Sequence, residues 1–244
     1  MMDAASAAAH AQIAPDPERL VARAADWLAG AIAATPGGFR LVLSGGATPR
    51  PLYRLLASDA FAPRIDWPSI EFFFGDERMV PHTHPDSNCR MARQTLLDHV
   101  PVTAQAVHPM PTDGTAQDCA RRYETLLQQR YGRDAFDPAE PLFDVVLLGM
   151  GADGHTASLL PGEPVLEDRT HWVAAVPHGR SEARLTLTYP AIASSRHVAF
   201  LVTGAEKARA VAAMRAGDAR LPAARIASDG EVIWFLDRAA AGTL

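Results

Sequence analysis

The stretch FDVVLLGMGADGHTAS (143–158) joins the most apolar run of the chain to a loop that carries three glycines, an aspartate and a histidine. A short apolar run bounded by turn-forming residues is typical of a strand that is buried on both faces of a sheet. Glycines let the chain turn sharply, so the polar side chains of this loop can be aimed into a cleft. We therefore predict a buried strand over 143–148 that ends at a functional loop.

Strands of the same kind alternate with helices along the rest of the chain. The apolar pattern predicts strands over 39–43, 70–74, 171–176, 197–202 and 232–236, and helices over 17–34, 49–58, 90–99, 118–131 and from 203 onward. This alternation indicates a Rossmann-like α/β fold with a mostly parallel sheet and helices on both faces. No repeat or long linker divides the chain, so we predict one domain over 17–244 and a disordered or frayed tail over 1–16.

Composition argues against several classes of protein. The formal net charge of −5 is unlike that of a general nucleic-acid surface, which would be basic. No apolar run reaches the roughly 18–20 residues that cross a membrane, and the N-terminus lacks the features of a signal peptide. Cys89 and Cys119 fit no metal spacing, and His82 and His84 have no obvious further ligands. We expect a cytoplasmic protein with reduced thiols and no metal site.

Four polar or glycine-rich loops directly follow predicted strands: SGG (44–46), GDER (75–78), GMGADGH (149–155) and TGAEK (203–207). In open α/β sheets, ligands bind beyond the carboxyl ends of the strands. Because these ends share one edge of a parallel sheet, we expect the four loops to meet there. Their convergence predicts one ligand site and is stronger evidence than any single motif.

The loop SGGATP (44–49) has the features of an anion-binding cradle. Gly45 and Gly46 let backbone N–H groups approach a phosphate, and the start of the following helix adds partial positive charge. Ser44 and Thr48 offer hydroxyl donors. The alternative is a plain connection between a strand and a helix. The loop lacks the GK[ST] of a Walker A motif, which disfavours nucleotide hydrolysis.

Asp153 and His155 are the acid–base candidates of the loop 149–158. Histidine is the usual general base near neutral pH, and a nearby carboxylate can fix its tautomer and raise its basicity. The alternative is a histidine that only caps the following helix. GMGADG also matches GxGxxG, but Pro161 and Gly162 interrupt the helix that a dinucleotide site needs.

Two basic residues on these loops are candidates for substrate binding. Arg78 follows the apolar strand 70–74 and can make a forked contact with a phosphate or a carboxylate. Alternatively, Asp76 and Arg78 neutralise each other. Lys207 is the only lysine among 23 basic residues, which points weakly to a site that needs a compact ammonium. Its alternatives are chance survival and a surface ion pair with Glu206.

Taken together, SGGATP, GDERMVPHTHPDSN, GMGADGHTASLLPG, RLTLT and TGAEKA occur in an order and spacing that identify a family. On these motifs the chain resembles the 6-phosphogluconolactonases, which are related to the glucosamine-6-phosphate deaminases. The resemblance runs from about residue 18 to residue 236, and GDER with DGHTASL is its specific part. It implies the deaminase-related fold and hydrolysis of 6-phosphoglucono-δ-lactone to 6-phosphogluconate in the pentose phosphate pathway. It also implies that neither a metal nor an organic cofactor is needed.

The resemblance also implies roles for individual residues. His155 is expected to be the general base that activates water, Arg78 and the SGG loop to hold the substrate, and Asp76 to line the same cleft. The lactonases usually carry a lysine shortly before RLTLT, close to the phosphate.

In this chain the corresponding stretch is VPHGRSEAR (176–184), which has no lysine. His178 or Arg180 stands where the lysine is expected, and Arg184 follows. We expect a phosphate contact from Lys207 and further contacts from among these three residues. The expected partner is a phosphorylated sugar lactone, and no protein partner is predicted.

Two other functions remain as alternatives. The first is a glucosamine-6-phosphate deaminase/isomerase, but those enzymes carry a glutamate five residues after the histidine, where this chain has Leu160. The second is a sugar-phosphate-binding regulator without catalysis, against which an intact His155 and GDER argue. The chain has no nucleophile motif such as GxSxG, so direct attack by water is the simpler mechanism.

Overall fold

The structure is a computed structural model that describes residues 11–178 and 180–242. Its centre is a six-stranded sheet in which all neighbouring strands are parallel. In spatial order the strands are β1 (Ala11–Ala14), β9 (Glu231–Asp237), β8 (Ser195–Val202), β5 (Phe143–Leu148), β2 (Phe39–Leu43) and β3 (Ile70–Phe74). The predicted α/β fold with a mostly parallel sheet is confirmed.

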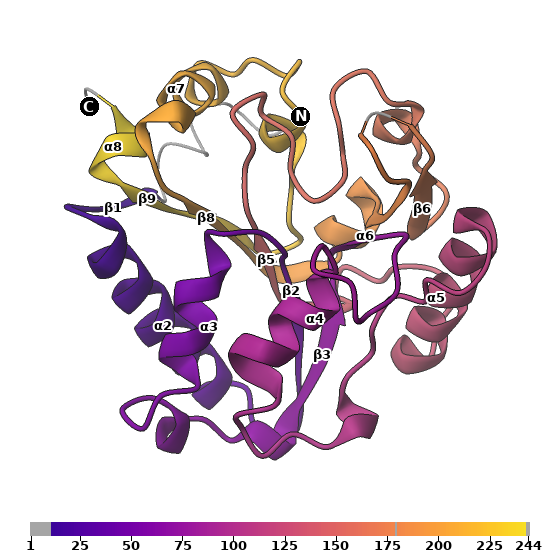
Figure 1. Ribbon diagram of the computed structural model, residues 1–244, viewed down its shortest axis with the longest axis horizontal. Coiled ribbons are helices and arrows are strands. Elements are labelled where there is room, and N and C mark those ends of the chain that lie inside the picture. Colours follow the sequence, from indigo (N-terminus) through magenta and orange to yellow (C-terminus); the bar gives the residue numbers. More distant parts are fainter. Residues whose placement is uncertain (1–10, 179, 243–244) are drawn as a thin grey trace.

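Helices cover both faces of this sheet, with α2 and α3 on one side and α6 and α7 on the other (Figure 1). The α-helices are α2 (Pro17–Ala33), α3 (Pro49–Leu56), α4 (Asn88–Ala92), α5 (Ala116–Tyr131), α6 (Tyr189–Ala193), α7 (Ala208–Arg215) and α8 (Arg238–Ala241). The short 3₁₀ turns are η1 (Ala62–Arg64), η2 (Trp67–Ser69), η4 (Ala104–Ala106), η5 (Pro164–Glu167), η6 (Ala205–Lys207) and η7 (Pro222–Arg225). The helix predicted over 90–99 is instead α4 followed by the π-helical turn η3 (Arg93–Leu97).

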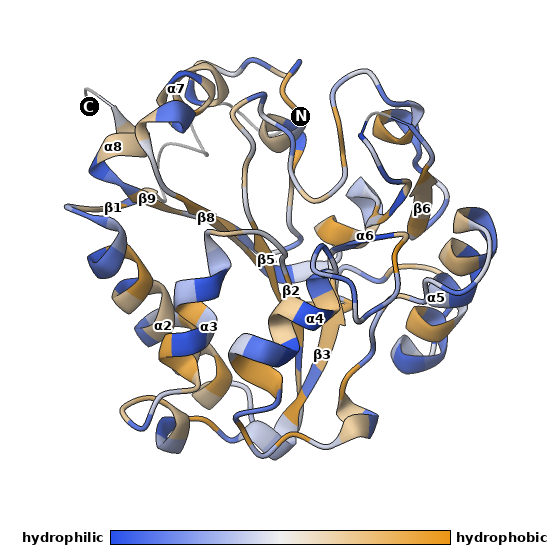
Figure 2. Ribbon diagram, viewed as in Figure 1, coloured by the Kyte–Doolittle hydropathy of each residue, from blue (hydrophilic) through white to orange (hydrophobic). Residues whose placement is uncertain are grey.

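The strands pack the core between these helices. Phe200 of β8 stacks on Trp234 of β9 with ring centroids 3.8 Å apart, and both side chains are fully buried. Hydrophobic residues run along the central strands, whereas the helices α2 and α5 carry hydrophobic and hydrophilic sides (Figure 2). Strands that are apolar on both faces need cover on both sides, which is why the chain interleaves them with amphipathic helices.

A second, antiparallel sheet was not predicted. Its strands are β4 (Asp76–Arg78), β7 (Arg184–Leu187) and β6 (Val173–Val176), in the order β4-β7-β6. GDER is therefore not only a loop. The carbonyl of Gly75 accepts from the N–H of Leu187, and the chain continues from Gly75 directly into β4. This pairing places Arg78 and Arg184 at directly facing positions on the neighbouring strands β4 and β7.

The expectation of a frayed tail over 1–16 is wrong for part of that range. Residues 11–14 form β1, which pairs in register with β9, and Arg23 donates to the carbonyl of Ile13 at 2.7 Å. An edge strand can be held by backbone hydrogen bonds to one neighbour, so four residues without a periodic pattern still join the sheet. Residues 1–10 lie outside the described part of the chain. None of the described helices is long and apolar enough to span a membrane.

Candidate active site

A cleft of about 770 Å³ opens at the carboxyl edge of the parallel strands. The loops after β2, β3, β5 and β8 all contribute to it, as their common position at one sheet edge predicts. The predicted site residues that line this cleft are Ser44, Gly45, Gly46, Thr48, Asp76, Arg78, His155, Arg184 and Lys207. The structure thus brings together most of the residues that the motifs single out.

Three predicted site residues do not line the cleft. Asp153 and Arg180 lie behind His155 and contact it. His178 lies elsewhere, in a separate depression beside α5 and β6. His178 follows the end of β6 by two residues, and β6 packs on α5. The structure therefore does not support His178 as a substrate contact.

The hydroxyl of Tyr53 fixes the backbone of the SGG loop at Ser44. The Tyr53 hydroxyl accepts from the N–H of Ser44 at 2.9 Å and donates to its carbonyl at 2.8 Å. Burial of this hydroxyl raises the pKa of Tyr53, so it stays protonated and can donate. From Gly45 to Thr48, no backbone N–H has an acceptor within the described part of the chain, and the Thr48 side chain makes no capping bond to α3. These donors remain available for an anion in the cleft.

His155 is held by Asp153. Nδ1 of the imidazole lies 2.5 Å from Oδ1 of Asp153, which also accepts from the backbone N–H of His155 at 3.2 Å. Burial raises the pKa of Asp153. The hydrogen bonds from His155 and the positive charge of the imidazole lower it more, so the pKa of Asp153 lies below its usual value. An ionised Asp153 accepts from Nδ1–H, which leaves Nε2 of His155 to take a proton.

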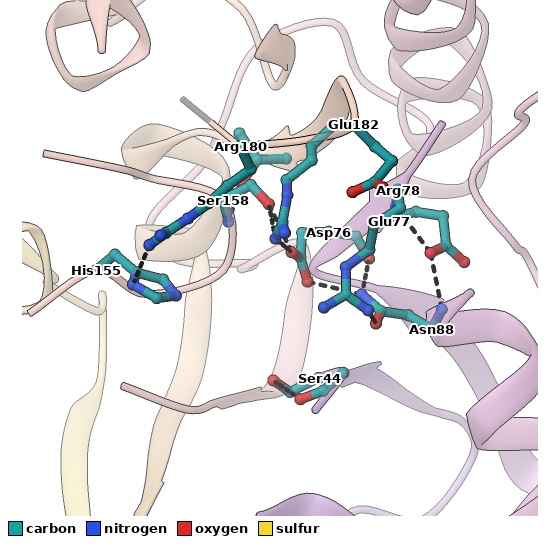
Figure 3. A network of polar contacts seen from close by, with 12 residues as sticks. Ser44, Asp76, Glu77, Arg78, Asn88, His155, Ser158, Arg180 and Glu182 are labelled. Carbon is teal, nitrogen blue, oxygen red and sulfur yellow. Dashed lines mark hydrogen bonds and ion pairs between the residues drawn. The ribbon is translucent and has the colours of Figure 1, made fainter. Parts of the chain in front are cut away.

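Asp76 and Arg78 are linked through Asn88 and do not pair directly (Figure 3). The Asn88 amide donates to Oδ1 of Asp76 at 3.0 Å, and its oxygen accepts from Arg78 at 2.6 Å. Ser158 donates to the other oxygen of Asp76 at 2.7 Å. The alternative in which Asp76 and Arg78 neutralise each other is therefore not what the structure shows.

Arg184 completes the cationic side of the cleft. Its Nη1 lies 4.0 Å from Asp76, and its side chain is only 13% exposed. Burial lowers the pKa of Arg184, Asp76 opposes this shift and Arg78 adds to it. Nε of Arg184 and Nε of Arg78 are both buried without a partner among the described residues. These unpaired donors favour an anionic or electron-rich ligand beside them.

Lys207 reaches the same cleft from η6. It forms no ion pair with any described residue, so the alternative of a surface pair with Glu206 is not observed. The turn that carries it is anchored by Asp237, which accepts from the N–H of Gly204 at 3.1 Å. In residues 11–178 and 180–242, no cluster of potential ligands could hold a metal ion.

Sequence reasoning did not single out Asn88, Ser158 or Glu77. The Glu77 carboxylate is buried and accepts from Ser87 and from the N–H groups of Arg78, Asn88 and Cys89, which ties β4 to the start of α4. One signal was available for Asn88, because it is the only asparagine in the chain. Ser158 could not be assigned from the sequence, since its contact with Asp76 joins segments that are 82 residues apart along the chain.

The comparisons with known proteins agree with this geometry. The family model described as glucosamine-6-phosphate isomerases/6-phosphogluconolactonase matches residues 15–234. The chain belongs to this family.

Its relatives include proteins named 6-phosphogluconolactonase. The protein of that name from Nostoc sp. is 40% identical over 96% of this chain and 97% of its own length. The Mycobacterium tuberculosis protein is also 40% identical, over 96% of this chain and 97% of its own. The solved 6-phosphogluconolactonase from Trypanosoma cruzi is 29% identical with a TM-score of 0.81, and 96% of each chain is covered. The resemblance inferred from the motifs is confirmed.

Proposed function

We propose that this chain hydrolyses 6-phosphoglucono-1,5-lactone to 6-phosphogluconate, a step of the pentose phosphate pathway, with water activated by His155. The observation that carries the proposal is the Asp153–His155 pair on the wall of a cleft that also presents free backbone amides and cations. The names of the relatives in the family support the lactone as substrate.

His155 provides the base. With Nδ1 engaged by Asp153, Nε2 takes a proton from water as the water oxygen attacks the lactone carbonyl carbon. The tetrahedral oxyanion collapses and breaks the bond from that carbon to the ring oxygen. The proton held on Nε2 passes to the departing ring oxygen, so the products are a carboxylic acid, which ionises in water, and a hydroxyl group.

The cations and amides of the cleft bind the rest of the substrate. We assign the 6-phosphate to the amides of the SGG loop and to Lys207, because among residues 11–178 and 180–242 this ammonium has no ion-pair partner and the amides have no acceptor. Arg78 and Arg184 supply positive charge at the same cleft. The Asn88 and Asp86 oxygens hold the Arg78 guanidinium, which pre-orients it for the substrate.

The side chain of Leu160 argues against deaminase activity. The position at which the related deaminases carry their glutamate is Leu160, which is apolar and 3% exposed. An aliphatic side chain cannot shuttle a proton, so opening of an amino-sugar ring lacks a required group.

A single comparison tests the proposal. The purified protein is assayed with freshly made 6-phosphogluconolactone, corrected for spontaneous hydrolysis, and with glucosamine 6-phosphate, from which released ammonia is measured. We expect hydrolysis of the lactone and no ammonia. Ammonia release at a comparable rate would favour the deaminase, and binding without turnover of either compound would favour a non-catalytic regulator.

A further inference from the structure

Arg180 contacts the catalytic pair from behind, outside the cleft. Its Nη2 lies 2.9 Å from Oδ2 of Asp153 and 3.4 Å from Nδ1 of His155. Figure 3 shows the Arg180 side chain extending toward the His155 ring. Arg180 is not among the residues that line the cleft. The position that was expected to bind phosphate is thus occupied by a side chain that touches the base.

We propose that Arg180 is a positioning residue that holds the Asp153 carboxylate against the His155 ring. This inference rests on the proposed function, since it assigns a role within that reaction.

Donors on both sides fix the plane of the Asp153 carboxylate. Its Oδ1 accepts from the ring and backbone of His155, and its Oδ2 accepts from Arg180. The Asp153 side chain is 43% exposed, and His155 and Arg180 are its only side-chain partners of opposite charge among the described residues. Without Arg180, water would solvate Oδ2 and the carboxylate could rotate, which would loosen the orientation of His155.

The other charged groups of the site lie on different elements. Asp76 and Arg78 come from β4, Arg184 from β7, and Glu206 and Lys207 from η6, all around the same cleft. In the described part of the chain, Asp153 is the only acidic partner of His155 within 4.0 Å. A change at Arg180 therefore acts on His155 more directly than a change at any of these groups.

The test compares R180Q, which removes the charge, with R180K, which keeps it. R121Q is the control, since Arg121 is an exposed residue of α5 outside the cleft. The values of kcat and KM are measured separately on 6-phosphogluconolactone and on unphosphorylated gluconolactone.

For R180Q we expect kcat to fall roughly 10-fold on both lactones, as misorientation of a base predicts. KM should stay near its wild-type value on both lactones. R180K keeps a cation that can donate to Asp153 and should recover most of the lost kcat, and R121Q should match the wild type.

Two results would overturn the inference. A higher KM for the phosphorylated lactone alone, with an unchanged kcat, would make Arg180 a phosphate ligand. An R180Q variant identical to the wild type would give it no role. The proposed function fails in a different way, if the wild type does not hydrolyse the lactone or if H155A keeps its turnover.

Discussion

In the loop after β5, the backbone of Gly151 packs so closely against His155 that a Cβ on residue 151 would overlap Nδ1 and Cε1 of the imidazole ring. The N–H of Gly151 also donates to the carbonyl of His155 at 2.9 Å, so the loop closes on itself. The glycine is needed here for close approach, since its φ is not among the positive values of the chain. The position of the His155 ring therefore depends on the absence of a side chain at residue 151.

Substitution G151A should displace His155 and reduce catalysis. We expect kcat to fall roughly 10²-fold, the effect of moving a catalytic group by about 1 Å, with little change in KM. G149A is the control, because a Cβ on Gly149 would meet nothing within 4 Å. A G151A variant with wild-type kcat would show that the ring is not held as the structure places it.

Loss of the base itself should have a larger effect. For H155A or H155Q we expect kcat to fall by roughly 10²–10⁴ with an unchanged fold by circular dichroism. The wild-type rate should also decline on acidification, as the imidazole becomes protonated. H171A removes a second histidine that is paired with an aspartate, Asp168, outside the cleft, and should keep full activity. Near wild-type turnover by H155A would refute the assignment.

Substitution D153N should disable the base without removing it. An asparagine amide can donate to Nδ1 and so favour the tautomer that carries its proton on Nε2, which cannot accept a proton from water. We expect a fall in kcat of roughly 10²–10⁴ and a smaller change in KM. D168N tests the same change in the other His–Asp pair and should leave kcat unaltered.

Substitution D153N should also change how the free energy of unfolding depends on pH. The pKa of Asp153 in the folded protein lies below its ordinary value of 3.8, so the ionised carboxylate is favoured in the folded state. Its stabilising contribution is fully present above that ordinary value and is lost as the pH falls through the folded pKa. Because the side chain is 43% exposed, solvent screens the contacts and we expect under about 1 kcal/mol. Urea unfolding of wild type and D153N should differ near pH 6 and converge near pH 2–3.

Substitution K207M tests the phosphate site. If Lys207 binds the phosphate, kcat/KM on the phosphorylated lactone should fall by a factor that corresponds to about 2–4 kcal/mol of transition-state binding. The loss should nearly vanish with unphosphorylated gluconolactone. R209M removes a neighbouring exposed charge that does not line the cleft, and should behave as the wild type. Equal losses on both lactones would point to a structural role for Lys207 and would move the phosphate toward Arg78 and Arg184.

Asn88 should matter for both stability and catalysis. N88A leaves the buried Asp76 and the half-buried Arg78 without their shared partner, which should cost about 1–3 kcal/mol in the free energy of unfolding. We also expect kcat/KM to fall roughly 10-fold, because both side chains line the cleft. Q94A, on the exposed side of the neighbouring π-helical turn, is the control. A neutral N88A would mean that Asp76 and Arg78 hold their positions unaided.

Much of the fold follows from local patterns. The apolar runs at 39–43, 70–74 and 143–148 are strands with the predicted bounds. Burial on both faces favours a nearly continuous apolar run, which distinguishes such strands from half-exposed ones with alternating polar residues. A parallel sheet then places the strand ends at one edge, so the loops that follow them had to meet. This is why the general location of the cleft was predictable.

The sequence by itself determined the strand–helix alternation, the glycine-rich loops and the edge at which they form a site, because hydrophobic period and backbone freedom are properties of neighbouring residues. Only the tertiary structure decided which side chains meet. The pairing of β4 with β7 sets Arg78 opposite Arg184, Asn88 approaches Gly45, and Arg180 turns to His155 while His178 remains outside the cleft. These contacts join residues that are separated along the chain, and they depend on how whole elements pack, which no local pattern encodes.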